Sequence, residues 1–302
     1  MPAPIIAAYE PFSDDRAPVK LALAAAELTG APVIAATVYP GPMTDAWVAP
    51  MPGDDGEGIV DEALQRLRDD LGVETRLLTE ASVPRALHDL ARELEAGLIV
   101  VGSTGRSRIG RVLTGSTAER VLQGAPCPVA LAPRGYEREP LRTIAVGWVD
   151  SPEGNAALTA AHALAAGAGA RLRVIAALHP SGGLDAAMAD GLRPPRSYTL
   201  QGRHRLEVEA ALKSAIAALP PGVEVESELH VEDPADVLLR VSEHVDLLVC
   251  GSRGYGPLRS VLLGGVSRRL VDESQCPVLV LPREARVPLE DLMAPNSAAA
   301  TP

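Results

Sequence analysis

The sequence predicts an α/β protein made of two tandem domains, each a doubly wound five-stranded parallel sheet. Short apolar runs rich in Val and Ile alternate with longer amphipathic segments along the chain, as strands and helices do in this fold class. The order also repeats, because Ile5 corresponds to Ile144 and Cys127 to Cys276, at offsets of 139 and 149. A tandem duplication explains the repetition, and the change of offset falls in a loop, where insertions are tolerated.

The length of 302 residues is sufficient for two domains that each bury their own core. We expect the first domain over residues 1–134 and the second over 141–283, joined by a linker near residues 134–141. The remaining residues, 284–302, are rich in Ala and Pro and are expected to be a largely disordered tail.

The composition limits the possible functions. A formal charge of −11, with 28 basic and 39 acidic residues, argues against a nucleic-acid partner. No apolar run approaches the roughly 18 residues that a membrane span needs. The three cysteines form no C-x-x-C pair and lie in or beside apolar runs, which indicates packing in a reducing compartment. The start of the chain has no basic region typical of a signal peptide, so a cytoplasmic protein is expected.

The first half begins with a strand and then alternates helices and strands. A glycine ends each of the first two helices, at Gly30 and Gly72, and Ser82 is the predicted N-cap of the third, with Pro84 in its first turn. A long loop over residues 40–58 is rich in Pro, Gly and Asp. The expected elements in order are residues 5–9, 18–29, 33–39, 59–71, 74–78, 82–94, 98–101, 117–123 and 128–131.

The second half repeats this order. Ser151 followed by Pro152 predicts a helix start, and Asp233 followed by Pro234 predicts another. A longer loop covers residues 179–202. The strands are expected over residues 144–146, 171–177, 224–228 and 247–250 and near 278, with an amphipathic helix over 206–219 and another helix through residue 242.

A glycine-rich stretch follows the fourth strand of each half. Its spacing is G-x2-G-x9-G in both copies, at Gly102, Gly105 and Gly115 and then at Gly251, Gly254 and Gly264. Strand, glycine loop and helix start together form an anion-binding device, because glycines allow close approach and the first turn of a helix has unpaired N–H groups. In a parallel sheet these loops lie at the carboxyl ends of the strands, where ligands bind at a topological switch point.

At these residues the chain resembles the universal stress protein family. The resemblance is carried by G-x2-G-x9-G-S in the first half, the repeated glycines in the second, and the Cys-Pro-Val strand that closes each half. It covers nearly the whole chain apart from the tail. The family implies a Rossmann-like fold of the adenine nucleotide α-hydrolase type, bound ATP with Mg²⁺ carried by the phosphates, and a regulatory role in stress responses. It also implies pairing through the last strands, here as an intramolecular pseudo-dimer, with a homodimer of such chains as a further option.

The resemblance also implies a set of nucleotide-binding residues, and no catalytic or metal-ligating residue is assigned. Glu10 stands where the family usually has Asp, and Ala118 replaces a hydroxyl found two residues after Ser116 in the family. In the second half Val149 occupies the acidic position, with Asp150 beside it, and Gly265 replaces the first hydroxyl. The first site is therefore expected to bind more readily than the second. The implied nucleotide-binding residues are Glu10, Val38, Gly102, Thr104, Gly105, Gly115, Ser116, Thr117, Gly251, Arg253, Gly254, Gly264, Gly265 and Ser267.

Three classes of function remain open on the sequence. The first is a nucleotide-binding regulator. The second is a slow ATPase, but the sequence offers no obvious general base beyond Glu10 and no lysine near the loops. The third is a scaffold that binds no nucleotide. Glycines can also serve only as tight strand-to-helix turns, but two copies at identical intervals favour binding. A P-loop is excluded because Arg111-Val112 follows Gly110 where Lys-Ser/Thr is required.

Overall fold

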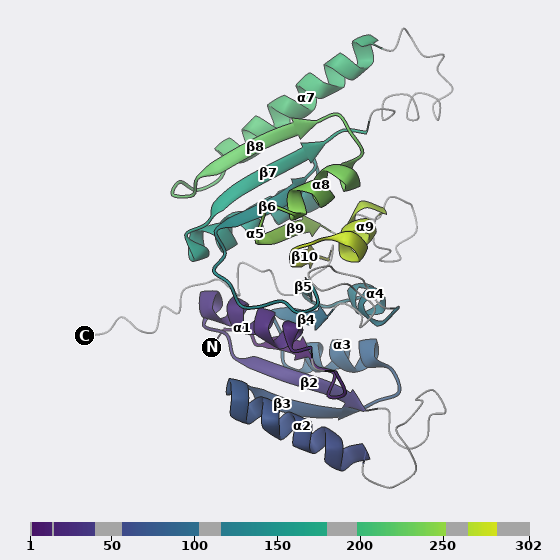
Figure 1. Cartoon of the computed structure of the whole chain (residues 1–302). Helices are drawn as coiled ribbons and strands as arrows, with labels where there is room; N and C mark the ends of the chain where they lie inside the picture. The colour runs from purple at the N-terminus through teal and green to yellow at the C-terminus, as the bar shows by residue number, and fades with distance from the viewer. Residues whose placement is uncertain are drawn as a thin grey trace, which may run out of the picture.

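The computed structural model describes residues 2–13, 15–39, 56–102, 116–179, 198–251 and 265–282, without the side chains of residues 56, 57, 116 and 198–201. Its strands form one ten-stranded sheet in the order β3-β2-β1-β4-β5-β10-β9-β6-β7-β8 (Figure 1). The two five-stranded sheets expected from the sequence are thus the two halves of one continuous sheet.

The first half alternates strand and helix in the predicted order. Its elements are β1 (Ile5–Ala8), α1 (Ala17–Thr29), β2 (Val33–Tyr39), α2 (Gly56–Leu71), β3 (Glu74–Thr79), α3 (Val83–Glu93), β4 (Leu98–Gly102), α4 (Ser116–Leu122) and β5 (Val129–Ala132). Within this half every pair of neighbouring strands is parallel.

The second half has the same strand order and parallel pairing. Its elements are β6 (Thr143–Trp148), α5 (Pro152–Ala168), β7 (Arg171–Ala177), α7 (Tyr198–Ala217), β8 (Val225–His230), α8 (Pro234–Ser242), β9 (Leu247–Gly251), α9 (Gly265–Glu273) and β10 (Val278–Leu281). The helix predicted to start at Leu206 begins at Tyr198 instead. Leu206 is 67% exposed, so it does not belong to the buried face of this helix.

Local signals set most helix ends. Gly30 and Gly169 end α1 and α5 in the left-handed conformation that glycine adopts without a steric cost. Ser151 accepts a hydrogen bond from the Gly154 N–H, and Asp233 caps α8 in the same way. Ser82 takes the N-cap position of α3 as predicted, but its side chain makes no capping hydrogen bond.

Two layers of helices cover the sheet. Helices α1, α2, α5 and α7 pack on one face, where Leu64, Leu67, Leu158 and Leu212 are buried against the strands. Helices α3, α4, α8 and α9 cover the other face. The strands are therefore apolar on both sides, which explains their continuous hydrophobic runs.

The halves meet at the antiparallel pair of β5 and β10, which are the last strands of each half. Helices α1 and α5 also contact each other across this junction. The arrangement is the intramolecular pairing that the family resemblance implied.

Some predicted features lie outside the described residues. They are most of the loop over 40–58, most of the loop over 179–202, and the tail 284–302. No helix in the described ranges has both the length and the apolar character that a membrane crossing requires.

Candidate functional site

The carboxyl ends of the strands form two related candidate sites. In the first half the chain moves from β1 to β2 and β3 on one side and then returns to place β4 on the other side of β1. The switch point therefore lies between β1 and β4. In the second half it lies between β6 and β9 by the same rule. Ligands of open α/β sheets bind at such points.

The end of β1 is fixed to β2 by two hydrogen bonds. The Tyr9 N–H donates to the Ala36 carbonyl at 2.9 Å, and the buried Thr37 hydroxyl donates to the Tyr9 carbonyl at 3.0 Å. Glu10 follows Tyr9 directly and is exposed, while the Val38 side chain is half-buried next to Thr37. The Thr37 hydroxyl thus holds together the two strand ends that carry the predicted acidic and β2 positions.

Gly102 ends β4 against the first turn of α1. A Cβ at Gly102 would lie 3.0 Å from Cγ of Pro18, so a larger residue would require the Pro18 ring to shift slightly. The predicted residues Thr104, Gly105 and Gly115 lie outside the described part of the chain. Ser116 is the first residue of α4, and the next residue, Thr117, is exposed at the start of this helix.

The corresponding part of the second half is shorter and tighter. Only residues 149–151 connect β6 to α5, whereas residues 9–16 connect β1 to α1. The Val149 carbonyl accepts a hydrogen bond from the Ser151 N–H at 2.8 Å, and a Cβ at Gly154 would lie only 2.0 Å from that carbonyl oxygen. Helix α5 therefore begins directly at the end of β6, with no room for a longer loop.

Gly251 and Ser267 have a clear structural role in the second half. The buried Ser267 hydroxyl donates to the Gly251 carbonyl at 3.1 Å, and a Cβ at Gly251 would lie 3.2 Å from the Glu153 carbonyl oxygen. Gly265 begins α9 and is exposed. The structure thus uses the donor of Ser267 within the protein. Arg253, Gly254 and Gly264 lie outside the described residues.

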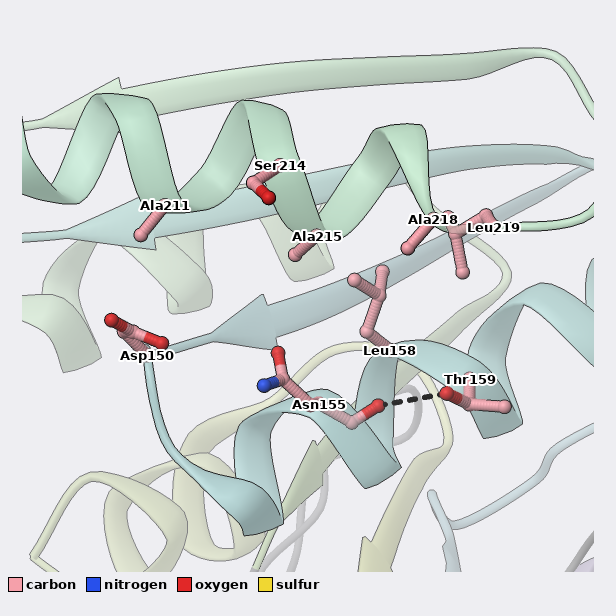
Figure 2. A pocket seen from close by; sticks show the side chains of 9 residues that line it. All are labelled: Asp150, Asn155, Leu158, Thr159, Ala211, Ser214, Ala215, Ala218 and Leu219. Atoms are coloured by element: carbon pink, nitrogen blue, oxygen red, sulfur yellow. Dashed lines mark hydrogen bonds between the residues drawn. The ribbon is translucent and has the colours of Figure 1, made fainter.

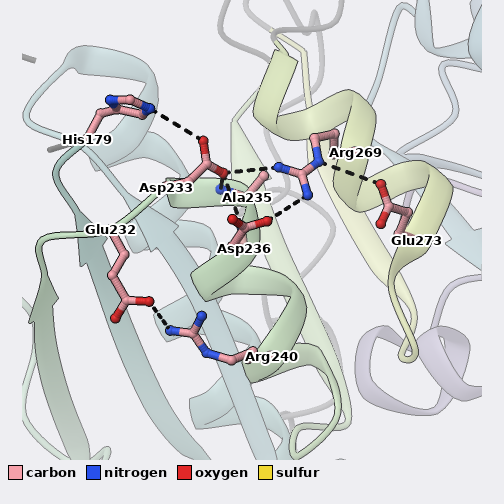
Figure 3. A network of polar contacts seen from close by, with 8 residues as sticks. All are labelled: His179, Glu232, Asp233, Ala235, Asp236, Arg240, Arg269 and Glu273. Carbon is pink, nitrogen blue, oxygen red and sulfur yellow. Dashed lines mark hydrogen bonds and ion pairs between the residues drawn. The ribbon is translucent and has the colours of Figure 1, made fainter. Parts of the chain in front are cut away.

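An ion-pair network joins α8 to α9 beside this second site (Figure 3). The Arg269 guanidinium donates to Asp233 at 3.1 Å and to Asp236 at 2.7 Å, and it lies 3.6 Å from Glu273. The hydrogen bond with Asp236 raises the pKa of Arg269 above its ordinary value. The positive charge of α9 is therefore already balanced by carboxylates of the protein.

In the first half no ion pair joins α3 to α4 among the residues that the structure describes, although Arg85 and Arg92 both pair with Asp89 within α3. Arg120 stands at the offset of 149 from Arg269, and no ion pair or hydrogen bond joins its exposed side chain to another residue in the ranges that the structure covers. The N-cap of α3 is Ser82 rather than an aspartate, and its third residue is Arg85 where α8 has Asp236. Arg85 itself pairs with Asp89 one turn further along α3, at 3.7 Å, so the contrast between the halves lies in Arg120 and Arg269.

A groove of about 430 Å³ lies between α5 and α7 (Figure 2). Asp150 lies at one end, and the rest of the lining is mainly small or apolar side chains of the two helices, with Asn155 and Thr159 on α5. Asp150, the residue considered as a substitute for the acidic position, therefore lines this groove. The Asn155 side chain also accepts a hydrogen bond from the indole of the buried Trp148.

The three cysteines are packing residues in this structure. Cys127, Cys250 and Cys276 are all buried and free, and burial raises the pKa of each thiol to about 12. They therefore remain protonated and unreactive near neutral pH. No cluster of side chains suited to a metal ion occurs among the residues whose placement is described.

Sequence reasoning overlooked two contributors to these sites. Thr37 is the only aliphatic hydroxyl in the otherwise apolar or aromatic run of β2, and that exception was a usable signal. The charge contrast between Arg120 and Arg269 depends on which helices pack together, so single positions in the sequence do not reveal it.

Comparisons with known proteins identify relatives of both halves. A model of the Universal stress protein family matches residues 1–133 and 140–282. The universal stress protein Rv2319c of Mycobacterium tuberculosis is 29% identical over 235 residues, which cover 72% of this chain and 75% of the relative. The universal stress protein Rv2005c of the same organism is 28% identical over 257 residues, covering 81% and 82%.

Solved structures show the same fold. The crystal structure of a universal stress protein from Archaeoglobus fulgidus DSM 4304 matches with a TM-score of 0.62 and 18% identity, covering 92% of this chain and 98% of that one. A shorter Archaeoglobus fulgidus protein was solved in complex with dAMP, at 27% identity and a TM-score of 0.32, but it covers 43% of this chain, so its ligand is a property of that protein. Both halves match the family model, and the chain belongs to the universal stress protein family.

Proposed function

We propose that this chain is a regulator that binds an adenine nucleotide, with ATP as the ligand and Mg²⁺ carried by its phosphates. The binding site is the switch point of the first half, at the ends of β1, β2 and β4 and the start of α4. Residues 1–134 and 141–283 act as its two domains, in the cytoplasm, and occupancy of the first site is the signal that the protein passes on.

The observation that carries this proposal is the difference between the two strand-to-helix connections. The first half has eight residues between β1 and α1, including the exposed Glu10, at the edge where a ligand would lie. The second half has three, and α5 fits closely against the Val149 carbonyl. A nucleotide needs both a backbone cradle for phosphate and polar groups for the nucleoside, and the sequence of the first half offers the glycines for the one and Glu10 for the other.

Two further features support the first site. Gly102 allows α1 to lie close to the end of β4, where a Cβ would be only 3.0 Å from Cγ of Pro18. No carboxylate pairs with Arg120 among the described residues, whereas Asp233 and Asp236 pair with Arg269 in the second half. A polyphosphate is attracted to a guanidinium that has no carboxylate partner, so this difference favours binding in the first half.

The proposal is tested by titrating the full chain with ATP and Mg²⁺ in a calorimeter, with GTP as the comparison ligand. We expect saturable ATP binding, and Gly105→Val should weaken it more than Gly254→Val. Equal losses in the two variants would contradict the ranking of the sites. An absence of saturable binding up to millimolar ATP would overturn the proposal and favour a nucleotide-independent scaffold.

The same samples separate a regulator from a slow ATPase. Phosphate release that Gly115→Val and Ser116→Ala abolish, and that boiled protein lacks, would indicate an enzyme. A regulator is expected to bind ATP without turnover that depends on these residues.

A further inference from the structure

The junction of the two halves brings together residues that occupy equivalent positions in the repeat. An offset of 149 relates Gly102 to Gly251 and Cys127 to Cys276. The same offset relates Ala130 to Leu279, and these two residues are partners in the antiparallel pair of β5 and β10. A position that faces its own counterpart lies on the pseudo-twofold axis between the halves.

A second contact has the same property. Arg268 on α9 forms an ion pair with Glu119 on α4, with 3.1 Å between Nε and Oε1. Glu119 and Arg268 are also separated by 149 residues. Glu119 and Arg268 therefore lie near the axis in the α4–α9 layer, whereas Ala130 and Leu279 belong to the core on the α1–α5 side.

In a symmetric pair of identical halves, each such position would face a copy of itself. Two copies of the first half would place Glu119 against Glu119 and Ala130 against Ala130. Two copies of the second half would place Arg268 against Arg268 and Leu279 against Leu279. Like charges repel, two small residues leave a void, and two large ones overfill a buried layer.

The actual junction avoids all four combinations. A carboxylate meets a guanidinium in one layer, and a small side chain meets a large one in the other, where Ala130 and Leu279 are each 4% exposed. The neighbouring pairs on the two strands, Val129 with Val280 and Leu131 with Val278, are nearly symmetric. The complementary differences are thus found at the positions where only unlike halves can satisfy them.

We propose that the α4–β5 surface of the first half and the α9–β10 surface of the second are specific for each other and reject a copy of themselves. Glu119, Arg268, Ala130 and Leu279 determine this specificity. The duplicated chain closes on itself, and neither half accepts its own kind through the last strand. Specificity of this kind needs unfavourable like pairs as well as favourable unlike ones.

The test is a pair of double-mutant cycles on the full chain. One cycle uses Glu119→Arg, Arg268→Glu and the double variant that carries both. The other uses Ala130→Leu, Leu279→Ala and the double variant that carries both. The measured quantity is the rate of amide hydrogen exchange in peptides covering residues 127–132 and 276–281, which reports opening of the β5–β10 pair.

We expect each single variant to speed amide hydrogen exchange in these peptides. Each double variant, in which the two residues are swapped, should restore slow hydrogen exchange. For the ion pair, hydrogen exchange in the double variant should be about three-fold slower than the product of the two single effects predicts. Salt at 1 M should remove this difference. For the apolar pair it should be larger, on the order of ten-fold, and insensitive to salt. The cycle also cancels the effect of each charge on its own helix dipole.

The matched control is Glu62 and Arg66, an exposed ion pair of 2.7 Å within α2. Reversing either charge there, or both, should leave exchange in the β5 and β10 peptides unchanged. Additive single effects in the charge cycle at low salt would overturn the proposal. So would exchange in the β5 and β10 peptides that is as slow in Glu119→Arg and Ala130→Leu as in the wild type, because both substitutions create a like pair at the junction. Because the charge variants alter partly exposed side chains, they remain folded and the test stays decisive.

Discussion

The two strand-to-helix connections that begin each half differ more than the sheets that carry them. Residues 9–16 form an eight-residue connection in the first half, and residues 149–151 form a three-residue connection in the second. Helix α5 has 17 residues and α1 has 13, so the second half has one extra helical turn where the first half has a loop. The strand order in both halves is identical.

This contrast shows which parts of a duplicated site change easily. The strand register, the glycine that ends β4 or β9, and the packing of the following helix are properties of the backbone and occur in both halves. The acidic side chain, the hydroxyl and the balance of charge on the neighbouring helices occur in one half or the other. Duplication therefore preserved the backbone framework, while these side chains diverged.

The largest predicted effect tests the tight connection of the second half. Gly154→Ala would place a Cβ 2.0 Å from the Val149 carbonyl oxygen, and backbone must move to accommodate it. We expect a loss of about 3 kcal/mol in the free energy of unfolding, measured by urea denaturation. The first half has Asp15 at the corresponding position, before the start of α1.

A glycine without such a neighbour provides the control. Gly202 lies within α7, and a Cβ there would meet nothing within 4 Å. Gly202→Ala should stabilise the protein by about 0.5–1 kcal/mol, because alanine favours a helix over glycine. Equal destabilisation by both substitutions would show that the close approach to Val149 does not limit the second half.

The sequence predicted the sheet well because buried parallel strands have a strong and local signal. Val33–Tyr39 and Arg171–Ala177 were predicted with their observed bounds, since their β-branched and apolar residues are typical of buried strands and Pro32 and Pro40 flank the first of them. The predicted start of α7 was wrong because the apolar face of this helix begins only at Val208, whereas residues 198–205, YTLQGRHR, are mostly polar and carry no helical periodicity. The pairing of Glu119 with Arg268 could not be predicted, because it depends on how the halves dock.

The Thr37 hydroxyl is predicted to matter in the first half alone. Ala176 occupies the equivalent position of β7, because Val33 and Leu172 both pair with the first isoleucine of their half. Thr37→Ala removes the buried hydrogen bond to the Tyr9 carbonyl and should cost about 1–2 kcal/mol in urea denaturation. Thr159→Ala, on the exposed face of α5, should change stability by less than about 0.5 kcal/mol. A similar loss of stability in both variants would show that the Thr37 hydrogen bond has no special role at the ends of β1 and β2.

The two acidic residues near the strand ends should differ in nucleotide binding. Glu10 is exposed in the long connection, whereas Asp150 lines the groove between α5 and α7. Glu10→Gln should weaken ATP binding about ten-fold, or about 1.4 kcal/mol, by removing a charged acceptor. Asp150→Asn should leave the affinity unchanged within a factor of about two. The comparison requires calorimetric titration at one ionic strength, and a larger effect of Asp150→Asn would reverse the ranking of the halves.

The smallest predicted effect distinguishes the outer edges of the sheet. On β8, burial raises the pKa of Glu228, but hydrogen bonds from Arg173 and His230 outweigh it and hold the pKa below the ordinary 4.5. A lowered carboxyl pKa contributes stability above the unfolded value, and this contribution is lost as the pH falls through the folded pKa. Stability from Glu228 should therefore be complete at pH 6 to 7 and decline below about 4.5.

Glu228→Gln should cost less than about 1 kcal/mol at pH 7, because the carboxylate is partly exposed and solvent screens the pair. The difference from wild type should shrink as the pH is lowered below 4.5 in urea denaturation. Glu226→Gln, on the same strand with an exposed side chain, is the matched control and should follow the wild-type pH profile. On β3 the corresponding position is Arg76, which pairs with Glu74 at 3.2 Å and with Glu93 at 3.6 Å. The two edges thus carry ion pairs of opposite polarity. If the free energy of unfolding of Glu228→Gln differed from that of the wild type by the same amount at every pH, packing rather than charge would stabilise β8.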